Sequence, residues 1–337
     1  MSPVFDCDVH CDVPGLEAIA PYLSRHWRDR FGENRWAGPA GIGHVYPPAV
    51  VSERLGDLEA VRAAALSGPA DRALLNCYYG VEMIRHPDLT AELSAAVNSW
   101  LREEFLAADD RLRASLVVPV EYPEAAAAEI RRWSREDGFV QVLMPVVSQT
   151  TYGNRRYWPI YRAAAERGFA IGLHFGGVSG APPTASGWPD SYIEEVAANA
   201  SVFQGQLLSL VAEGFFQEFP GLRLTLMESG VTWLPTILWR FDKMWKSYRR
   251  EIPWVKRLPS IDLRERVRLT TQPLDLPTDP GRALEFLETM ELEPLLLYSS
   301  DRPHLHGADC EVLIERMPAE RRAKVLYENA EQWYGLA

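Results

Sequence analysis

Short apolar runs alternate with segments of helical periodicity along most of the chain. Eight apolar runs predict β-strands at Val4–His10, Ala73–Tyr79, Leu112–Val120, Phe139–Val146, Phe169–Phe175, Leu222–Glu228, Val267–Pro273 and Leu295–Asp301. Apolar residues spaced three or four apart predict helices at Leu16–Phe31, Leu89–Leu106, Ala125–Trp133, Pro159–Arg167, Ser201–Glu218, Gly230–Arg249 and Gly281–Met290, followed by two C-terminal helices. This alternation is typical of a parallel sheet covered by helices.

Eight strand-and-helix units predict an α/β fold of the TIM or (β/α)8 barrel type, with the strands in a ring and the helices around it. No linker or low-complexity tract divides the chain, so we expect residues 1–337 to form a single barrel domain. A Gly- and Pro-rich stretch at 32–48 predicts a long insertion between the first and second strands. Loops at that end of a barrel carry substrate contacts, so His44 within the insertion is either a pocket residue or an ordinary surface histidine.

The fifth predicted strand indicates which of its side chains face the barrel interior. Ala170, Gly172 and His174 are small or able to bind a ligand, whereas the positions between them are bulky. Small residues suit a crowded barrel interior, so His174 is expected to point inward at the strand's C-terminal end. The same alternation groups Leu222, Leu224, Leu226 and Glu228 on one face of the sixth strand, and Leu295, Leu297, Ser299 and Asp301 on the inward face of the eighth.

The composition and net charge of the chain indicate which kinds of molecule it can bind. Hydrophobic residues make up 47% of the 337 and charged residues 24%, as in globular proteins. The net charge of −11, without a cluster of Lys or Arg, argues against binding to nucleic acid or to an anionic membrane. No window is apolar enough for a transmembrane helix and no signal-peptide pattern is present, so we expect a cytoplasmic protein. The expected partner is a small-molecule substrate, and a homodimer is left open.

Residues able to bind a metal stand at the ends of four predicted strands. Asp8 and His10 lie two apart and so share a face of the first strand, while His174, Glu228 and Asp301 end the fifth, sixth and eighth strands. Because the chemistry of such barrels sits at the C-terminal ends of the strands, these side chains should converge. Mixed nitrogen and oxygen ligands suit one Zn²⁺, Mn²⁺ or Fe²⁺ ion, and Glu228 could recruit a second.

Several aromatic and basic residues are candidates for contact with the substrate. The aromatic candidates, which fit an apolar or aromatic substrate but equally fit core packing, are Trp158, Phe175, Trp188 and Tyr192. The Gly-, Pro- and Ser-rich stretch 176–189 is either a mobile lid or an ordinary surface loop. Arg302 is a further candidate, and it is also a cation that could compensate Glu228 if that carboxylate is buried.

Five short motifs together resemble the amidohydrolase superfamily, in the amidohydrolase-related (family 2) branch that also contains the aminocarboxymuconate-semialdehyde decarboxylase-like enzymes. The motifs are Asp6–His10, Gly172–Gly177, Glu228–Pro235, Gln272–Pro273 and Ser300–His304. The resemblance covers essentially the whole chain and implies a metal-dependent hydrolase type of barrel. It further implies that Asp8, His10, His174 and Asp301 bind the metal, with Asp301 as the proton acceptor in hydrolytic members.

The sequence departs from the family pattern at two positions. The first strand carries Asp8-x-His10 where many members have His-x-His, a change that resembles the acid-x-His pattern of decarboxylating members. Glu228 stands where many members have a histidine, which such decarboxylases use to handle protons. The fourth strand offers no Lys or Glu to bridge two metals, and this favours a single ion.

These observations leave three functions open. The main interpretation is hydrolysis of a small apolar or aromatic amide, ester, lactone or thioester by a metal-activated water. In that case Asp301 accepts the water proton, Glu228 orients the water or the substrate, and His304 supports Asp301. The alternatives are non-oxidative decarboxylation of an aromatic or unsaturated carboxylic acid at the same metal, and a catalytically silent barrel that binds a ligand.

Overall fold

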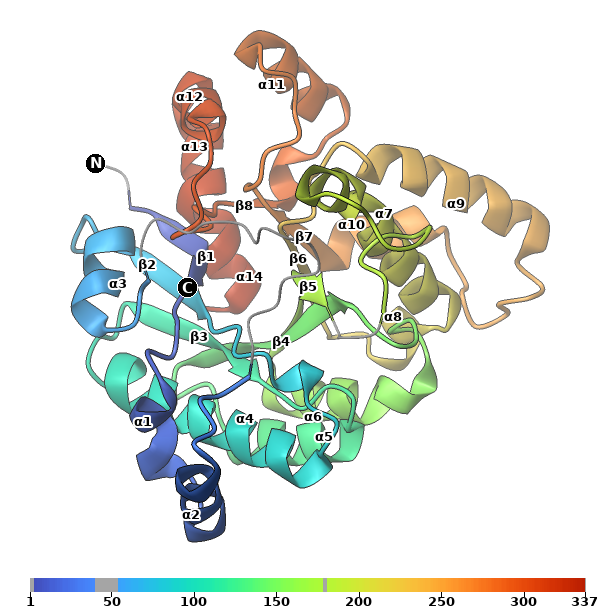
Figure 1. Cartoon of the computed structure of the whole chain (residues 1–337). Helices are drawn as coiled ribbons and strands as arrows, with labels where there is room; N and C mark the ends of the chain where they lie inside the picture. The colour runs from blue at the N-terminus through green and yellow to red at the C-terminus, as the bar shows by residue number, and fades with distance from the viewer. Residues whose placement is uncertain (1–2, 40–53, 178–180, 337) are drawn as a thin grey trace.

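The computed structural model describes residues 3–39, 54–177 and 181–336. His44 and part of the stretch 176–189 lie outside the described residues. The described chain forms a ring of strands with helices around it (Figure 1). The TIM barrel predicted from the sequence is confirmed.

Eight parallel strands follow one another around the barrel in sequence order. They are β1 (Phe5–His10), β2 (Arg72–Asn76), β3 (Leu112–Val117), β4 (Phe139–Val147), β5 (Ala170–Gly177), β6 (Leu224–Met227), β7 (Val267–Thr270) and β8 (Leu296–Leu297). Backbone hydrogen bonds close the ring between β1 and the chain around β8: the amide of Cys7 donates to the carbonyl of Tyr298 (2.8 Å), and that of Asp301 donates to the carbonyl of Asp8 (3.0 Å).

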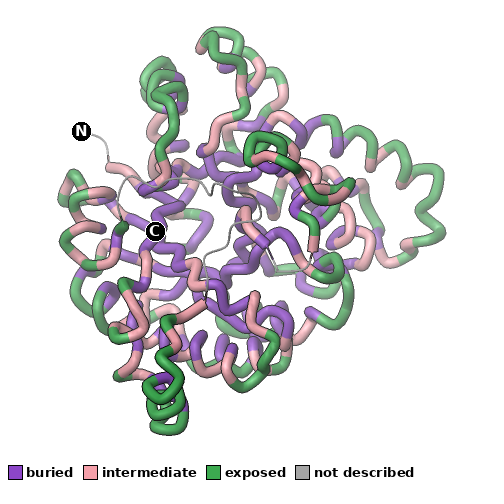
Figure 2. Tube along the Cα trace, viewed as in Figure 1, coloured by how far each residue is buried: buried purple, intermediate pink, exposed green. Residues whose placement is uncertain are grey.

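Helices surround the barrel, and the exposed positions concentrate on their outer sides (Figure 2). The helices are α1 (Leu16–Ile19), α2 (Arg25–Asn34), α3 (Leu58–Ala65), α4 (Pro87–Leu101), α5 (Pro123–Arg132), α6 (Trp158–Arg167), α7 (Tyr192–Ala212), α8 (Phe215–Glu218), α9 (Leu234–Tyr248), α10 (Pro259–Arg266), α11 (Pro280–Thr289), α12 (Asp309–Arg316), α13 (Ala319–Ala323) and α14 (Asn329–Tyr334). Shorter 3-10 or π-helical turns lie at Ala20–Tyr22, Val81–Met83, Arg102–Leu106, Arg155–Tyr157, Glu293–Leu295 and Lys324–Glu328.

Two of the predicted helices differ from those in the structure. The helix expected over Leu16–Phe31 is broken into α1, a 3-10 turn and α2, because Pro21 has no amide hydrogen with which to continue the helix. The helix expected over Ser201–Glu218 begins instead at Tyr192 and ends at Ala212. A left-handed Gly214 (φ 83°) then separates it from α8.

The bottom of the barrel is sealed by the C-terminal helix α14, which is seen inside the ring in Figure 1. Its Trp333 donates from Nε1 to Oγ1 of Thr225 on β6 (2.9 Å), and the hydroxyl of Tyr334 donates to Oε1 of Gln141 on β4 (3.1 Å). A Cβ on Gly172 would lie 2.5 Å from the Gln141 side chain, so this position faces the interior and has no room for a larger residue. The interior is therefore packed below and leaves only its upper end for chemistry.

Candidate metal centre

The five predicted metal ligands lie together at the C-terminal end of the barrel. Nε2 of His10 is 2.9 Å from Oδ1 of Asp301, 3.4 Å from Oε1 of Glu228 and 3.7 Å from Oδ1 of Asp8. Nε2 of His174 is 3.5 Å from Oδ1 of Asp8 and 3.7 Å from Oε1 of Glu228. All five residues are buried or nearly so, with at most 9% of their surface exposed.

Three ligand atoms of this cluster are buried without a hydrogen-bond partner: Oδ2 of Asp8, Nε2 of His10 and Nε2 of His174. Nδ1 of His174 lies 2.7 Å from the carbonyl oxygen of Phe175 and donates to it, which leaves the Nε2 lone pair free for a metal. Nε2 of His10 touches the carboxylates without the alignment of a hydrogen bond. Since buried polar atoms are normally paired, this donor set fits a divalent cation.

Asp8 is held in place by a residue that sequence reasoning missed. Nδ2 of Asn76, at the end of β2, donates to Oδ1 of Asp8 (2.7 Å), the carboxylate oxygen that also lies nearest to the two histidines. Asn76 lies inside an apolar run, and nothing in its immediate sequence marks it as part of the site. Mutation of a residue that hydrogen-bonds to a metal ligand commonly lowers metal affinity or activity by about 10- to 100-fold.

Asp301 contacts three histidines. Its Oδ1 lies 2.9 Å from Nδ1 of His304, and its Oδ2 lies 2.6 Å from Nε2 of His306. Burial alone would raise the pKa of Asp301, but the contacts with His10, His304 and His306 outweigh it and hold that pKa well below its usual value. His306 was not among the predicted site residues, although it lies only two residues after the motif Ser300–His304.

Glu228 reaches the cluster by a route that the alternation along β6 does not predict. Thr225 pairs with Gly172 and Met227 pairs with His174, so these positions face the interior, and Leu226 beside Leu173 faces the outer helices. The grouping of Glu228 with the leucines would therefore place it outside. A left-handed backbone conformation at Glu228 (φ 59°) turns its side chain inward instead.

The cations that face Glu228 are histidines rather than Arg302. The side chain of Arg302 donates to the carbonyl of Ala64, away from the cluster. Burial and the neighbouring Asp301 raise the pKa of Glu228, and His174 and His10 partly offset this. In return, Glu228 and Asp8 outweigh the effect of burial and raise the pKa of His174 to about 9. Three buried carboxylates, those of Asp8, Glu228 and Asp301, lie beside these histidines, and such a concentration of negative groups attracts a divalent ion.

Two overlapping groups of side chains each have ligand atoms within 4.8 Å of one another: Asp8, His10, His174 and Glu228, and His10, Glu228, Asp301 and His304. The two groups share His10 and Glu228. Strand β4 contributes no ligand-forming side chain above Gln141 in the described structure. This arrangement fits one ion between the groups and leaves Glu228 free to contact either that ion or its water.

The predicted substrate contacts separate into two sets. Tyr192 stands at the start of α7 and is 45% exposed. Partial burial and, after it, the negative charges of Glu228, Glu195 and Asp301 raise the pKa of its hydroxyl. Trp188 is 58% exposed on the loop before it. Phe175 is half-buried against the main core. Trp158 packs in the outer helical layer against Phe219, with ring centroids 5.8 Å apart, so the structure does not bring it to the cluster.

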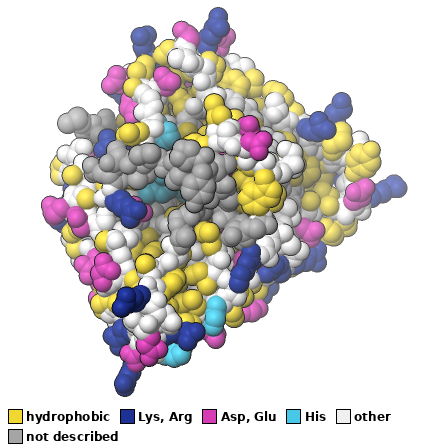
Figure 3. All heavy atoms as spheres, viewed as in Figure 1, with side chains coloured by type: hydrophobic (Ala, Val, Ile, Leu, Met, Phe, Trp, Pro, Cys, Tyr) yellow, Lys and Arg dark blue, Asp and Glu magenta, His cyan; other side chains and the backbone are white. Residues whose placement is uncertain are grey.

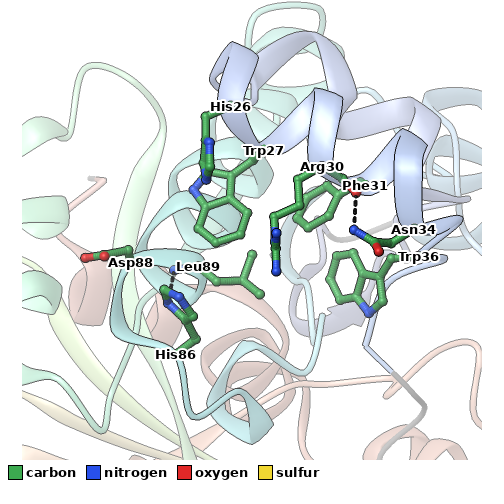
Figure 4. A pocket seen from close by; sticks show the side chains of 9 residues that line it. All are labelled: His26, Trp27, Arg30, Phe31, Asn34, Trp36, His86, Asp88 and Leu89. Atoms are coloured by element: carbon green, nitrogen blue, oxygen red, sulfur yellow. Dashed lines mark hydrogen bonds between the residues drawn. The ribbon is translucent and has the colours of Figure 1, made fainter.

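A separate groove lies away from the metal cluster. It encloses about 560 Å³ between α2 and the beginning of α4, and Figure 4 shows the Arg30 side chain extending into it between Trp27 and Trp36. None of its lining residues belongs to the metal cluster.

On the face drawn in Figure 3, acidic and basic side chains are interspersed rather than gathered by sign. Within the described residues no helix has the length and apolarity needed to cross a membrane.

A TIM barrel with a buried carboxylate and imidazole cluster at its C-terminal end defines the class as a metal-binding barrel of the enzyme type. The sequence profile of the family Amidohydro_2, described as amidohydrolase, matches residues 7–336. The chain therefore belongs to the amidohydrolase family, as its motifs predicted.

Several relatives of this chain are decarboxylases. The gamma-resorcylate decarboxylase of Rhodococcus jostii (strain RHA1) is 29% identical over 179 residues, which cover 48% of this chain and 52% of that protein. The match thus spans about half the length of that curated relative.

Solved structures share the fold over the whole chain. The 5-carboxyvanillate decarboxylase of Novosphingobium aromaticivorans, with manganese and 3-methoxy-4-hydroxy-5-nitrobenzoic acid, has a TM-score of 0.74 at 22% identity, covering 99% of this chain and 97% of that one. The dihydroxybenzoic acid decarboxylase of Polaromonas sp. JS666, with manganese and the inhibitor 2-nitroresorcinol, has a TM-score of 0.69 at 19% identity, covering 100% and 98%. Manganese in these relatives agrees with the divalent metal expected from the ligand types.

Proposed function

We propose that this protein is a metal-dependent, non-oxidative decarboxylase of a phenolic aromatic acid. The observation that carries the proposal is the buried cluster of Asp8, His10, His174 and Asp301, in which Asp8, His10 and His174 each have a ligand atom without a hydrogen-bond partner and Oδ1 of Asp301 lies 2.9 Å from Nε2 of His10. The relatives with this fold that act on hydroxylated benzoates support it over hydrolysis, which was the main interpretation of the sequence. The Asp8-x-His10 pattern agrees with the acid-x-His pattern of decarboxylating family members.

Metal binding and proton transfer are each assigned to residues of the cluster in this proposal. Asp8, His10, His174 and Asp301 would hold the ion, with Asn76 fixing Asp8. A bound divalent ion would polarise the carboxylate and a neighbouring phenolic oxygen of the substrate. When the bond between ring and carboxylate breaks, CO₂ leaves and the ring carbon must take up one proton. Asp301, which contacts His304 and His306, would manage that proton.

Hydrolysis is the second candidate, and Glu228 is the observation that favours it. A carboxylate in the position where decarboxylating members have histidine can accept a proton from an attacking water, together with Asp301. Its Oε1 lies 3.4 Å from Nε2 of His10, within the same cluster. The substrate would then be an amide, ester, lactone or thioester of similar size.

Product analysis separates the two candidates. Manganese-loaded protein would be incubated with gamma-resorcylate, with 5-carboxyvanillate, and with phenyl esters and lactones of matched size. We expect release of CO₂ and the corresponding phenol from at least one acid, no release from chelator-treated protein, and strongly reduced release from Asp301→Asn. Cleavage of an ester or lactone by fully loaded protein, without CO₂ from any ortho-hydroxy acid, would establish hydrolysis instead.

A further inference from the structure

A small cavity lies beside the metal cluster, above the ends of β2, β3 and β4. It encloses about 20 Å³ and is lined by Cys77, Tyr78, Tyr79, Val81, Glu82, Val117, Val118, Val120, Leu143 and Pro145. Tyr78 connects it with the metal centre, because its ring centroid is 5.3 Å from that of His174. A volume of this size holds one water molecule or one small substituent of a larger ligand.

Three polar atoms of the residues that line this otherwise mainly apolar cavity have no hydrogen-bond partner: Oε1 of Glu82 and the hydroxyl oxygens of Tyr78 and Tyr79. The Tyr79 hydroxyl lies beside Gly38, where an added Cβ would be 3.0 Å from it, whereas the Tyr78 hydroxyl lies within reach of the Glu82 charge. Glu82 is 7% exposed, and no ion pair to it exists among the described residues. The mechanism proposed above uses neither Tyr78 nor Glu82. Burying a carboxyl oxygen without a hydrogen bond costs free energy. Buried polar atoms normally have a partner, so Oε1 of Glu82 is expected to bind a ligand group from outside the chain.

The backbone fixes the position of the Tyr78 hydroxyl. Gly176, at the top of β5, has a φ of 126°, and a Cβ there would lie 2.9 Å from the Tyr78 hydroxyl oxygen. A side chain at position 176 would thus push the phenol away from His174. A phenol hydroxyl both donates and accepts hydrogen bonds, so Tyr78 can donate to an oxygen of a ligand that enters this space.

We propose that Tyr78 and Glu82 form a subsite that binds a second hydroxyl group on the aromatic ring of the substrate. The inference rests on the proposed function and names its substrate class as a ring bearing a hydroxyl besides the groups that reach the metal. One hydroxyl satisfies both orphan atoms, since it donates to Glu82 and accepts from Tyr78. A methoxy group satisfies only Tyr78, and a hydrogen atom satisfies neither. Pockets built for a hydroxyl discriminate strongly against analogues that lack it.

Binding of nitrophenols to manganese-loaded protein tests the subsite without knowledge of the true substrate. The reference probe is 2-nitrophenol, and the comparison probes keep its adjacent nitro and hydroxyl groups and carry one more hydroxyl at different ring positions: 2-nitroresorcinol, 3-nitrocatechol and 2-nitrohydroquinone. The variants are Tyr78→Phe and Glu82→Met, with Glu82→Gln as the conservative change. Glu121→Gln is the control, because Glu121 is also a buried carboxyl without hydrogen bonds, but it lies 3.5 Å from Arg156 and does not line the cavity.

We expect at least one dihydroxy probe to bind wild-type protein about tenfold more tightly than 2-nitrophenol. This advantage should disappear in Glu82→Met and shrink in Tyr78→Phe, persist in part in Glu82→Gln, and remain intact in Glu121→Gln. Affinity for 2-nitrophenol itself and manganese content should stay unchanged in all four variants. Equal affinities in wild-type protein, or an advantage that survives in both Glu82→Met and Tyr78→Phe, would show that the cavity holds only a fixed water.

A crystal structure of manganese-loaded protein with 2-nitroresorcinol gives an independent reading. A ligand oxygen between Tyr78 and Glu82 supports the subsite, whereas a water there with the ring directed elsewhere overturns it. Failure of the proposed function is distinguishable from failure of the subsite. If the protein prefers the dihydroxy probes but releases no CO₂, the subsite is supported and the proposed decarboxylase function is not. If the protein releases CO₂ and Glu82 has no effect, the function is supported and the subsite is not.

Discussion

Nε2 of His10 lies 2.9 Å from Oδ1 of Asp301, across the seam where the first strand meets the chain that follows the last one. The same seam is joined by the backbone, because the amide of His10 donates to the carbonyl of Arg302 (2.8 Å). The contacts that close the barrel therefore also bring the proposed metal ligands together. Residues at the two ends of the chain become neighbours only when all eight strands are in place.

Removal of His174 should empty the metal centre. Wild-type protein should contain about one equivalent of Zn²⁺, Mn²⁺ or Fe²⁺, since the ligand atoms are mixed nitrogen and oxygen and converge on one point. His174→Ala and, separately, His10→Ala should lose most of it by elemental analysis. His26→Ala, on the exposed side of α2, is the matched control and should keep its metal. Full occupancy in both cluster variants would mean that the ion binds elsewhere.

Replacement of Asp301 by asparagine should lower turnover without unfolding the barrel. Loss of a group that transfers a proton commonly costs about 10²- to 10⁴-fold in rate. The fold should survive because interior packing below the site rests on other residues, such as Leu297 and Tyr334. The comparison needs circular dichroism and metal analysis beside the rate. A near-normal rate in a metal-replete Asp301→Asn protein would remove the assigned role.

Glu228→Gln separates a role at the metal from a purely structural one. The substitution keeps the shape and removes a charge that faces His10 and His174. We therefore expect lower metal affinity and lower turnover, measured by metal titration and by CO₂ release. If the charge serves stability alone, the variant should instead unfold more readily while its metal affinity and rate stay at wild-type values.

The stability of the metal-free protein should depend on pH through Glu82. Burial raises the pKa of Glu82 to about 7 in the folded chain, against about 4.3 in an unfolded one. The folded state thus binds this proton more tightly, and stability falls as the pH rises from about 4 to 7 by roughly 2–3 kcal/mol. Glu82→Gln cannot ionise and should lack this slope. Urea unfolding of both proteins at pH 5 and pH 8 measures it, and parallel curves would contradict the burial argument.

Asp109 should make the opposite contribution to pH dependence. Contacts with Arg111 and Arg62 outweigh burial and hold the pKa of Asp109 well below its usual value. Its stabilising effect is fully present above the unfolded-chain value of about 3.9 and is lost as the pH falls toward the folded value. Asp109→Asn should cost about 1.5–3 kcal/mol at pH 7 and progressively less in acid, measured by urea unfolding. An equal loss at pH 7 and pH 3 would show that the charge is not responsible.

Much of the barrel could be predicted from the sequence because each strand is a short apolar run that ends at polar residues. The ligands His10 and His174 followed from period-two alternation within extended strands. Glu228 did not, since its inward direction depends on a left-handed φ of 59° that alternation cannot express. The break at Pro21 was readable in principle from its missing amide hydrogen, yet the periodicity of the flanking residues concealed it.

Contacts between distant segments were the part that the sequence could not supply. Asn76 supports Asp8 from a different strand, and Glu82 meets Tyr78 in a cavity that exists only after β2, β3 and β4 align. In the same way, aromatic character did not distinguish Trp158, packed among outer helices, from Tyr192 near the cluster. Such residues are assigned by their neighbours in space and not by their type.

Anomalous diffraction from a manganese-loaded crystal tests the central claim most directly, namely that Asp8, His10, His174 and Asp301 form one metal centre. We predict a single strong peak at the C-terminal end of the barrel, roughly 2.0–2.3 Å from Nε2 of both histidines and from carboxylate oxygens of both aspartates. Asn76 should still donate to Asp8 in that structure. A fully manganese-loaded crystal with its peak held by other residues would contradict the account.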